Sequence, residues 1–242
     1  MSVYVYAVTA AATAVPRSLR GIGDPPARLR KLTAGPLAAV VSAAPDRVRA
    51  RRRDLQAHQD VLLALAGVGP VLPTRFGLLA TEEEDVLAQL RAAPDPYAAA
   101  LETVAGHVEM NLKASPVEAG LPALVREDPQ VRRLREESRS RPSYDASIRL
   151  GEAVVAGLRR RAATAAGDAV AALTALAARA EPGPQVPGCV LNVSFLLPAA
   201  RVADCRAAVD EVAERVGDRA ALRLTGPLPC YSFCSLPALT GV

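Results

Sequence analysis

The stretch Gly69–Gly77 reads GPVLPTRFG, and the fold prediction starts from it. Val71 and Leu72 are typical of a short buried strand, but Pro73 has no backbone N–H to give to a neighbouring strand. We therefore expect residues 71–76 to form a strand at the edge of a sheet, or a strand that ends where Pro73 does not have to donate a hydrogen bond to a neighbouring strand.

Arg75 needs its own explanation within this stretch. It lies on the same side of the expected strand as Val71, and Phe76 beside it should be buried. A guanidinium on a covered face needs a carboxylate or several carbonyls as partners. We expect a structural clamp between Arg75 and Glu109, with the acids at 82–85 as alternative partners and an exposed, partner-binding Arg75 as the rival interpretation.

Strands and helices alternate irregularly around this stretch, which predicts an α+β fold with two α+β domains. The boundary is expected near residue 105, giving a domain over 1–104 and a second over 105–242 that includes a helical segment at 122–181. Hydrophobic periodicity predicts strands at 2–9, 37–42, 108–112, 190–197 and 220–225, and helices at about 46–66, about 142–180 (with a bend or break at its glycines) and 199–216.

The acidic run after residue 81 has a local structural explanation. Thr81 can cap the following helix while Glu84 reaches back to it, which is a capping box. Carboxylates are also favoured in the first turn of a helix by its dipole. We therefore interpret this run as a helix start and not as a metal cluster.

Composition favours a globular protein, because half of the 242 residues are apolar and 22% are charged. The N-terminal residues alternate like a strand and have no basic flank, so a signal peptide is not expected. The longest uncharged run, between Glu181 and Arg201, is broken by prolines and glycines and is too short to span a bilayer. These features predict a cytoplasmic protein without a membrane partner.

Catalytic signatures are missing from the sequence. It contains no phosphate-binding loop, zinc-protease motif or nucleophile elbow. His58 lies on the apolar face of its helix and is expected to be a hydrogen-bonded core residue. Cys230 and Cys234 have poor spacing for a shared metal. We expect no catalytic residue, cofactor, metal or small-molecule substrate.

The segment Arg47–Arg53 carries five arginines in seven residues and could contact phosphate. Nucleic-acid modules usually add stacking aromatic residues, and none lies nearby. A basic regulator that binds nucleic acid through this segment is therefore the alternative interpretation. A solvated helix start or a protein contact through Arg51, Arg52 and Arg53 is preferred.

Five motifs in order resemble the gas vesicle protein F/L family. They are VLPTRFG (71–77), EEEDVLAQL (82–90), GHVEMNLKA (106–114), VLNVSFLLP (190–198) and LTGPLPCYSF (224–233). The resemblance implies a modified ferredoxin-like second domain and a non-enzymatic accessory protein. Such a protein would help the small hydrophobic main shell protein to nucleate without aggregating, in a chaperone-like manner, and would contact other accessory proteins of the vesicle.

The C-terminal motif departs from the family pattern, which is commonly richer in proline and aromatic residues. Leu228 stands where a large ring is common, and Cys230 stands where a proline is common. By the resemblance, Leu228, Tyr231 and Phe233 are candidate partner contacts.

Overall fold

The structure is a computed structural model that describes residues 2–234. This part of the chain forms two compact units: unit 1 contains residues 2–109 and 227–234, and unit 2 contains residues 110–226. The division lies a few residues after the expected boundary near 105. The expectation that the C-terminal end belongs to the second domain is corrected, because the chain returns to unit 1 after Gly226.

Unit 1 is built on an antiparallel sheet with the order β2-β3-β1-β4, and β5 also pairs with β1. The strands are β1 (Val3–Ala10), β2 (Arg30–Ala34), β3 (Leu37–Ala43), β4 (Val71–Pro73) and β5 (Leu79–Ala80). Pro73 pairs with Ala7 in β4, which is the last strand of this order. The prediction of an edge strand at Pro73 is confirmed, because a strand at the edge has one side without a ladder.

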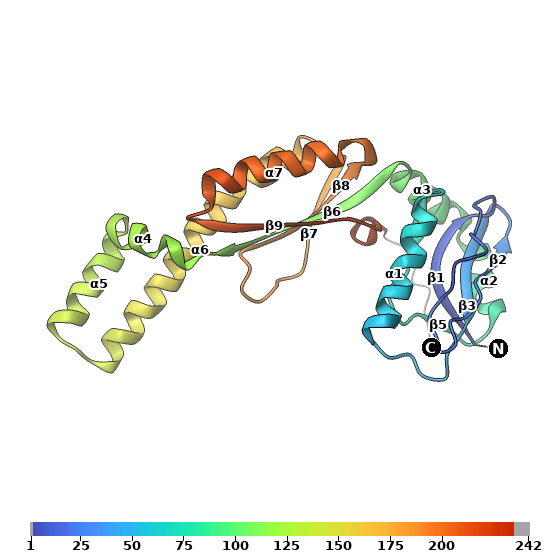
Figure 1. Cartoon of the computed structure of the whole chain (residues 1–242), viewed down its shortest axis with the longest axis horizontal. Helices are drawn as coiled ribbons and strands as arrows, with labels where there is room; N and C mark the ends of the chain where they lie inside the picture. Colours follow the sequence, from blue (N-terminus) through green and yellow to red (C-terminus); the bar gives the residue numbers. More distant parts are fainter. Residues whose placement is uncertain (1, 235–242) are drawn as a thin grey trace. The chain divides into compact units, whose positions relative to one another are not determined.

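Both faces of this sheet are covered, since β1 is buried from Val3 to Val8 although successive side chains point to opposite faces. Tyr4 and Tyr6 pack with Leu62 and its neighbours on α1 (Arg52–Ala66). The helices α2 (Glu83–Ala92) and α3 (Pro94–Val104) pack against other parts of the sheet, as Figure 1 shows.

Two helix starts differ from their predicted positions. Residues 46–51 are not helical, and α1 begins at Arg52 after an extended Arg51. The capping box of α2 is one residue later than expected: the Glu82 backbone N–H donates to Asp85 Oδ2 at 3.0 Å. Because residues 82–85 are all acidic, the sequence allows a capping box at either of two adjacent positions. Only the structure shows which of the two is formed.

Unit 2 contains a second sheet with the order β7-β8-β6-β9. Its strands are β6 (His107–Pro116), β7 (Arg179–Pro182), β8 (Leu191–Pro198) and β9 (Ala220–Leu228). The helices α6 (Tyr144–Thr174) and α7 (Val202–Val216) pack against it (Figure 1). Without the inserted helices before α6, the element order is βαββαβ, as in ferredoxin-like folds.

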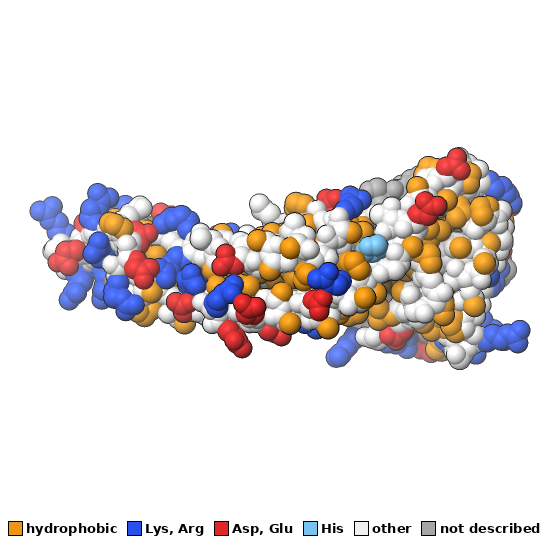
Figure 2. Space-filling view, turned by 90° about the horizontal axis from the view of Figure 1, so that it is seen from above, with side chains coloured by type: hydrophobic (Ala, Val, Ile, Leu, Met, Phe, Trp, Pro, Cys, Tyr) orange, Lys and Arg blue, Asp and Glu red, His pale blue; other side chains and the backbone are white. Residues whose placement is uncertain are grey.

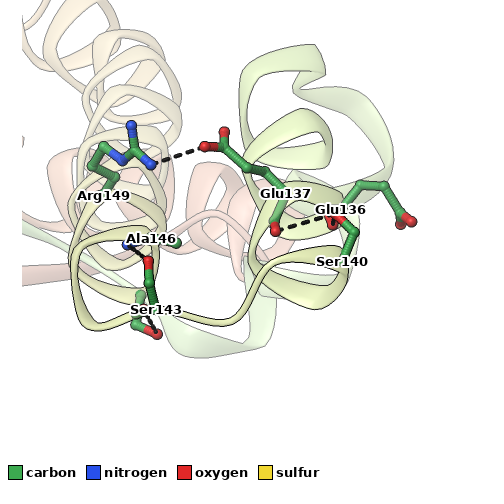
Figure 3. Close-up of polar contacts among 7 residues, drawn as sticks. Glu136, Glu137, Ser140, Ser143, Ala146 and Arg149 are labelled. Carbon is green, nitrogen blue, oxygen red and sulfur yellow. Dashed lines mark hydrogen bonds and ion pairs between the residues drawn. The ribbon is translucent and has the colours of Figure 1, made fainter.

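The inserted helices are α4 (Leu121–Glu127) and α5 (Pro129–Ser140), and both pack on α6. Gly157 allows the close approach, because a Cβ there would lie 2.7 Å from Leu124 Cδ1. At the α5–α6 turn, Ser143 Oγ accepts from the Ala146 N–H at 3.1 Å and Arg149 bonds Glu137 at 2.8 Å (Figure 3). The predicted break of the helix at its glycines does not occur, because α6 is continuous from Tyr144 to Thr174.

Three short 3-10 helices complete the described residues: η1 (Glu118–Gly120), η2 (Ala199–Arg201) and η3 (Tyr231–Phe233). None of the helices in residues 2–234 combines the length and the apolar character that crossing a bilayer requires.

Candidate functional site

The last described segment of the chain docks on unit 1, and we call residues 229–234 the C-terminal latch. It contains η3, with Cys230 and Phe233 buried and Tyr231 partly exposed. The expectation of a partner contact through Phe233 is corrected, because a buried ring is not available to a partner. Leu228, at the end of β9, is half-buried.

Glu109 holds the latch in place. Its side chain is only 4% exposed, and both carboxylate oxygens accept from the same residue. The Ser232 backbone N–H donates to Oε2 at 2.8 Å, and the Ser232 hydroxyl donates to Oε1 at 2.7 Å. A carboxylate removed from water needs bonds of this kind, so the pair is a specific anchor between distant parts of the sequence.

Arg75 does not take part in this anchor. It is exposed, and among the ion pairs of residues 2–234 none joins it to Glu109. The expected clamp is therefore corrected: Glu109 does clamp two segments, but its partner is Ser232. The reason is that β4 ends at Pro73, so the side-chain alternation assumed for residues 71–76 does not continue to Arg75.

His58 lies at the centre of a buried polar and aromatic cluster. Its Nδ1 lies 3.0 Å from the Tyr4 hydroxyl, and its Nε2 lies 3.2 Å from the Thr74 carbonyl oxygen. A proton on Nε2 satisfies both bonds, with the Tyr4 hydroxyl as donor to Nδ1. The Tyr231 hydroxyl of the latch lies 3.4 Å from Nε2, and Phe76 packs edge-on against the imidazole. The prediction of a hydrogen-bonded core histidine is confirmed.

Burial keeps this cluster neutral. It lowers the pKa of His58 and raises the pKa of Tyr4, while it raises the pKa of Tyr231 to about 12. The thiols of the latch behave likewise, since burial raises the pKa of Cys230 and of Cys234 to about 12. A protonated thiol is a poor nucleophile, so burial disfavours nucleophilic attack by Cys230 and Cys234.

The basic segment before α1 is exposed. Arg51, Arg52 and Arg53 all reach solvent, and Arg53 pairs with Asp24 at 2.9 Å. Groups of three or more side chains that could hold a metal ion are absent from residues 2–234.

Helix α6 carries an exposed apolar stripe towards its N-terminal end. Tyr144 is 81% exposed, Ile148 42% and Val155 58%. At about 100° per residue they lie within about 40° of each other around the helix axis. Ala162, Ala166 and Leu173 follow these three residues by 18 positions each, so they lie on the same side of the helix, and they are buried. The apolar periodicity therefore marks one stripe that is exposed near the start of α6 and buried further along it.

Comparison with known proteins places this fold among gas vesicle proteins. The family model for gas vesicle synthesis protein GvpL/GvpF matches residues 2–235. Gas vesicle protein F of Streptomyces sp. (strain CB03234) is 38% identical over 237 residues, covering 96% of this chain and 99% of that protein. Gas vesicle protein L of the same strain is 32% identical over 256 residues, with coverages of 96% and 92%.

Two solved structures have the same fold. The crystal structure of GvpF from Anabaena sp. PCC7120 has a TM-score of 0.79 at 20% identity and covers 98% of this chain and 99% of its own. That of GvpF from Microcystis aeruginosa has a TM-score of 0.76 at 22% identity, with coverages of 97% and 99%.

Proposed function

This chain belongs to the gas vesicle GvpL/GvpF family, and from that membership we propose that it is an accessory protein of gas vesicle assembly that acts by binding, without turnover. Its partners are the hydrophobic main shell protein and other accessory proteins of the vesicle. By covering apolar surface on the shell protein it aids nucleation and prevents aggregation, and it is associated with the vesicle.

One observation carries this proposal: the family match extends over residues 2–235, and the identity exceeds 30% to both an F and an L protein. The buried polar residues support a binding role, because the bonds of His58 and Glu109 are made within unit 1 and stabilise it.

The stripe on α6 supplies a binding surface for the apolar partner. A protein that binds a hydrophobic subunit must offer apolar area while its remaining surface keeps it in solution. Tyr144, Ile148 and Val155 offer such area, and basic and acidic side chains are mixed over the helices around them, as the left part of Figure 2 shows. An apolar helix face of this kind fits against another helix or a hydrophobic groove.

Co-expression tests the proposal. The chain and the main shell protein of the same gene cluster are produced together, with an affinity tag on the chain. We expect the shell protein to remain in the supernatant and to elute with the tagged chain, whereas it sediments when produced alone. Shell protein that sediments equally in both cases, with none on the affinity resin, would contradict the proposed function.

A further inference from the structure

A cleft of about 400 Å³ lies in unit 1 beside the start of α1. That volume is within the range of sites for small molecules. Four arginines line it, and its wall also includes three acids: Arg47, Arg49, Arg51, Arg53, Asp24, Asp46 and Asp54.

The charges of the cleft do not cancel. Arg53 is paired with Asp24 at 2.9 Å and with Asp54 at 3.6 Å, so these three side chains neutralise one another in part. Among the ion pairs formed within residues 2–234, none includes Arg47, Arg49 or Arg51. Asp46 is the one acid of the cleft wall outside the Arg53 pairs, so four arginines stand against three acids and the lining has one positive charge in excess.

The backbone that carries these arginines is anchored. Ile22 of the opposite wall is a buried core residue, and Val48 packs on the same core cluster. The Arg51 N–H donates to the Arg49 carbonyl at 2.7 Å, which forms a tight turn between the two arginines. The Arg53–Asp24 pair ties the two walls together. An anchored wall reduces the entropy that a ligand would have to remove.

The same residues are locally unfavourable at a helix start. Arg51 is the N-cap of α1, and its side chain has no acceptor atom for the first backbone N–H groups. Arg52 and Arg53 add positive charge at the positive end of the helix dipole, and Asp54 in the same turn offsets only part of it. A bound anion in the neighbouring cleft would offset both effects.

We propose that this cleft binds a compact anion that carries several phosphoryl groups. Guanidinium groups match phosphate oxygens through paired hydrogen bonds, and four arginines line one hollow here. A free oligophosphate or nucleotide and the backbone of a nucleic acid offer the same chemistry. The limited volume favours the compact ligand, and this inference does not depend on the role in gas vesicle assembly.

Isothermal titration of the full chain with sodium tripolyphosphate tests the proposal. The first variant is Arg47→Gln/Arg49→Gln/Arg51→Gln, in the cleft. The matched control is Arg132→Gln/Arg135→Gln/Arg139→Gln, which removes the same charge from exposed positions on α5 in unit 2. We expect the parent and the control to bind with similar affinity, and the cleft variant to bind about tenfold more weakly or worse, because charge-assisted bonds are lost.

A parallel titration with a single-stranded oligonucleotide separates the two sources of phosphate. We expect tripolyphosphate to displace any bound oligonucleotide from the parent. Oligonucleotide binding without tripolyphosphate binding would overturn the proposal in favour of a nucleic-acid surface. Equal weakening in both triple variants, or no tripolyphosphate binding by the parent, would also overturn it.

Discussion

The region around His58 and the hairpin of α5 and α6 use similar residue types in opposite ways. Around His58, the polar groups of Tyr4, Tyr6 and Glu109 are buried and each is bonded to a defined partner. On the hairpin, ion pairs such as Arg149–Glu137 are exposed, and the apolar side chains of the α6 stripe also face solvent.

This difference separates stability from binding. A buried polar group whose bond is removed keeps its full desolvation penalty, whereas an exposed ion pair contributes little. We therefore expect substitutions around His58 to change the free energy of unfolding. Substitutions on the hairpin should change partner binding.

The largest expected contrast is between two aliphatic truncations. Leu62→Ala removes a fully buried side chain beneath Tyr4 and Tyr6 and should lower the free energy of unfolding by about 2–5 kcal/mol. Ile148→Ala on the α6 stripe should change it by no more than about 0.5 kcal/mol. Urea titrations of both variants measure the two values, and equal losses would remove the contrast.

A smaller contrast concerns the carboxylates. Glu109→Gln keeps the shape of the side chain but replaces one of the two acceptors of Ser232 by a donor. We expect a loss of about 1.5–3 kcal/mol, since both bonds are made to a charged group. Glu137→Gln breaks only an exposed pair and should cost at most about 1 kcal/mol. A neutral Glu109→Gln would show that the latch is not anchored by this carboxylate.

Hydroxyl removal should give a contrast of about 1 kcal/mol. In Tyr6→Phe the Ile22 N–H loses an acceptor 2.7 Å away, and the Ser42 hydroxyl loses its bond to Tyr6. Tyr144→Phe removes an exposed hydroxyl and should have no measurable effect. Thermal unfolding of the two variants measures this difference. A Tyr6→Phe protein as stable as the parent would argue against the hydrogen-bonded cluster.

The pH dependence gives the smallest expected effect. Burial lowers the pKa of folded His58, so below about pH 6.5, the ordinary value for histidine, the unfolded chain binds the extra proton first. The stability contributed by neutral His58 should therefore fall as the pH drops below that value. His58→Gln should show a shallower decline between pH 6.5 and 5. Identical pH profiles for the variant and the parent would contradict a neutral, buried imidazole.

Local patterns in the sequence were sufficient to predict much of the fold. Pro73 predicted an edge strand because its missing donor is a property of the residue alone. The histidine in the core was predicted because Leu62 and Leu65 repeat with His58 at helical spacing.

The site depended on contacts that no local pattern contains. Glu109 and Ser232 are 123 residues apart, and their bond requires the chain to return to unit 1 after β9. Arg75 was misplaced because the strand ends two residues earlier, where the Thr74 N–H bonds the Tyr6 carbonyl. The exposure of the α6 stripe could not be predicted from periodicity, because its exposed and buried parts lie on the same side of the helix, 18 residues apart.

We expect the exposed apolar side chains on α6 to bind the shell protein, and one co-elution measurement tests this most directly. Ile148→Gln/Val155→Gln is co-expressed with the shell protein beside Leu55→Gln/Leu63→Gln, which alters two exposed leucines on α1. We expect the α6 variant to lose most of the co-eluting shell protein while the α1 variant and the parent retain it. Full retention by a folded α6 variant would contradict the claim.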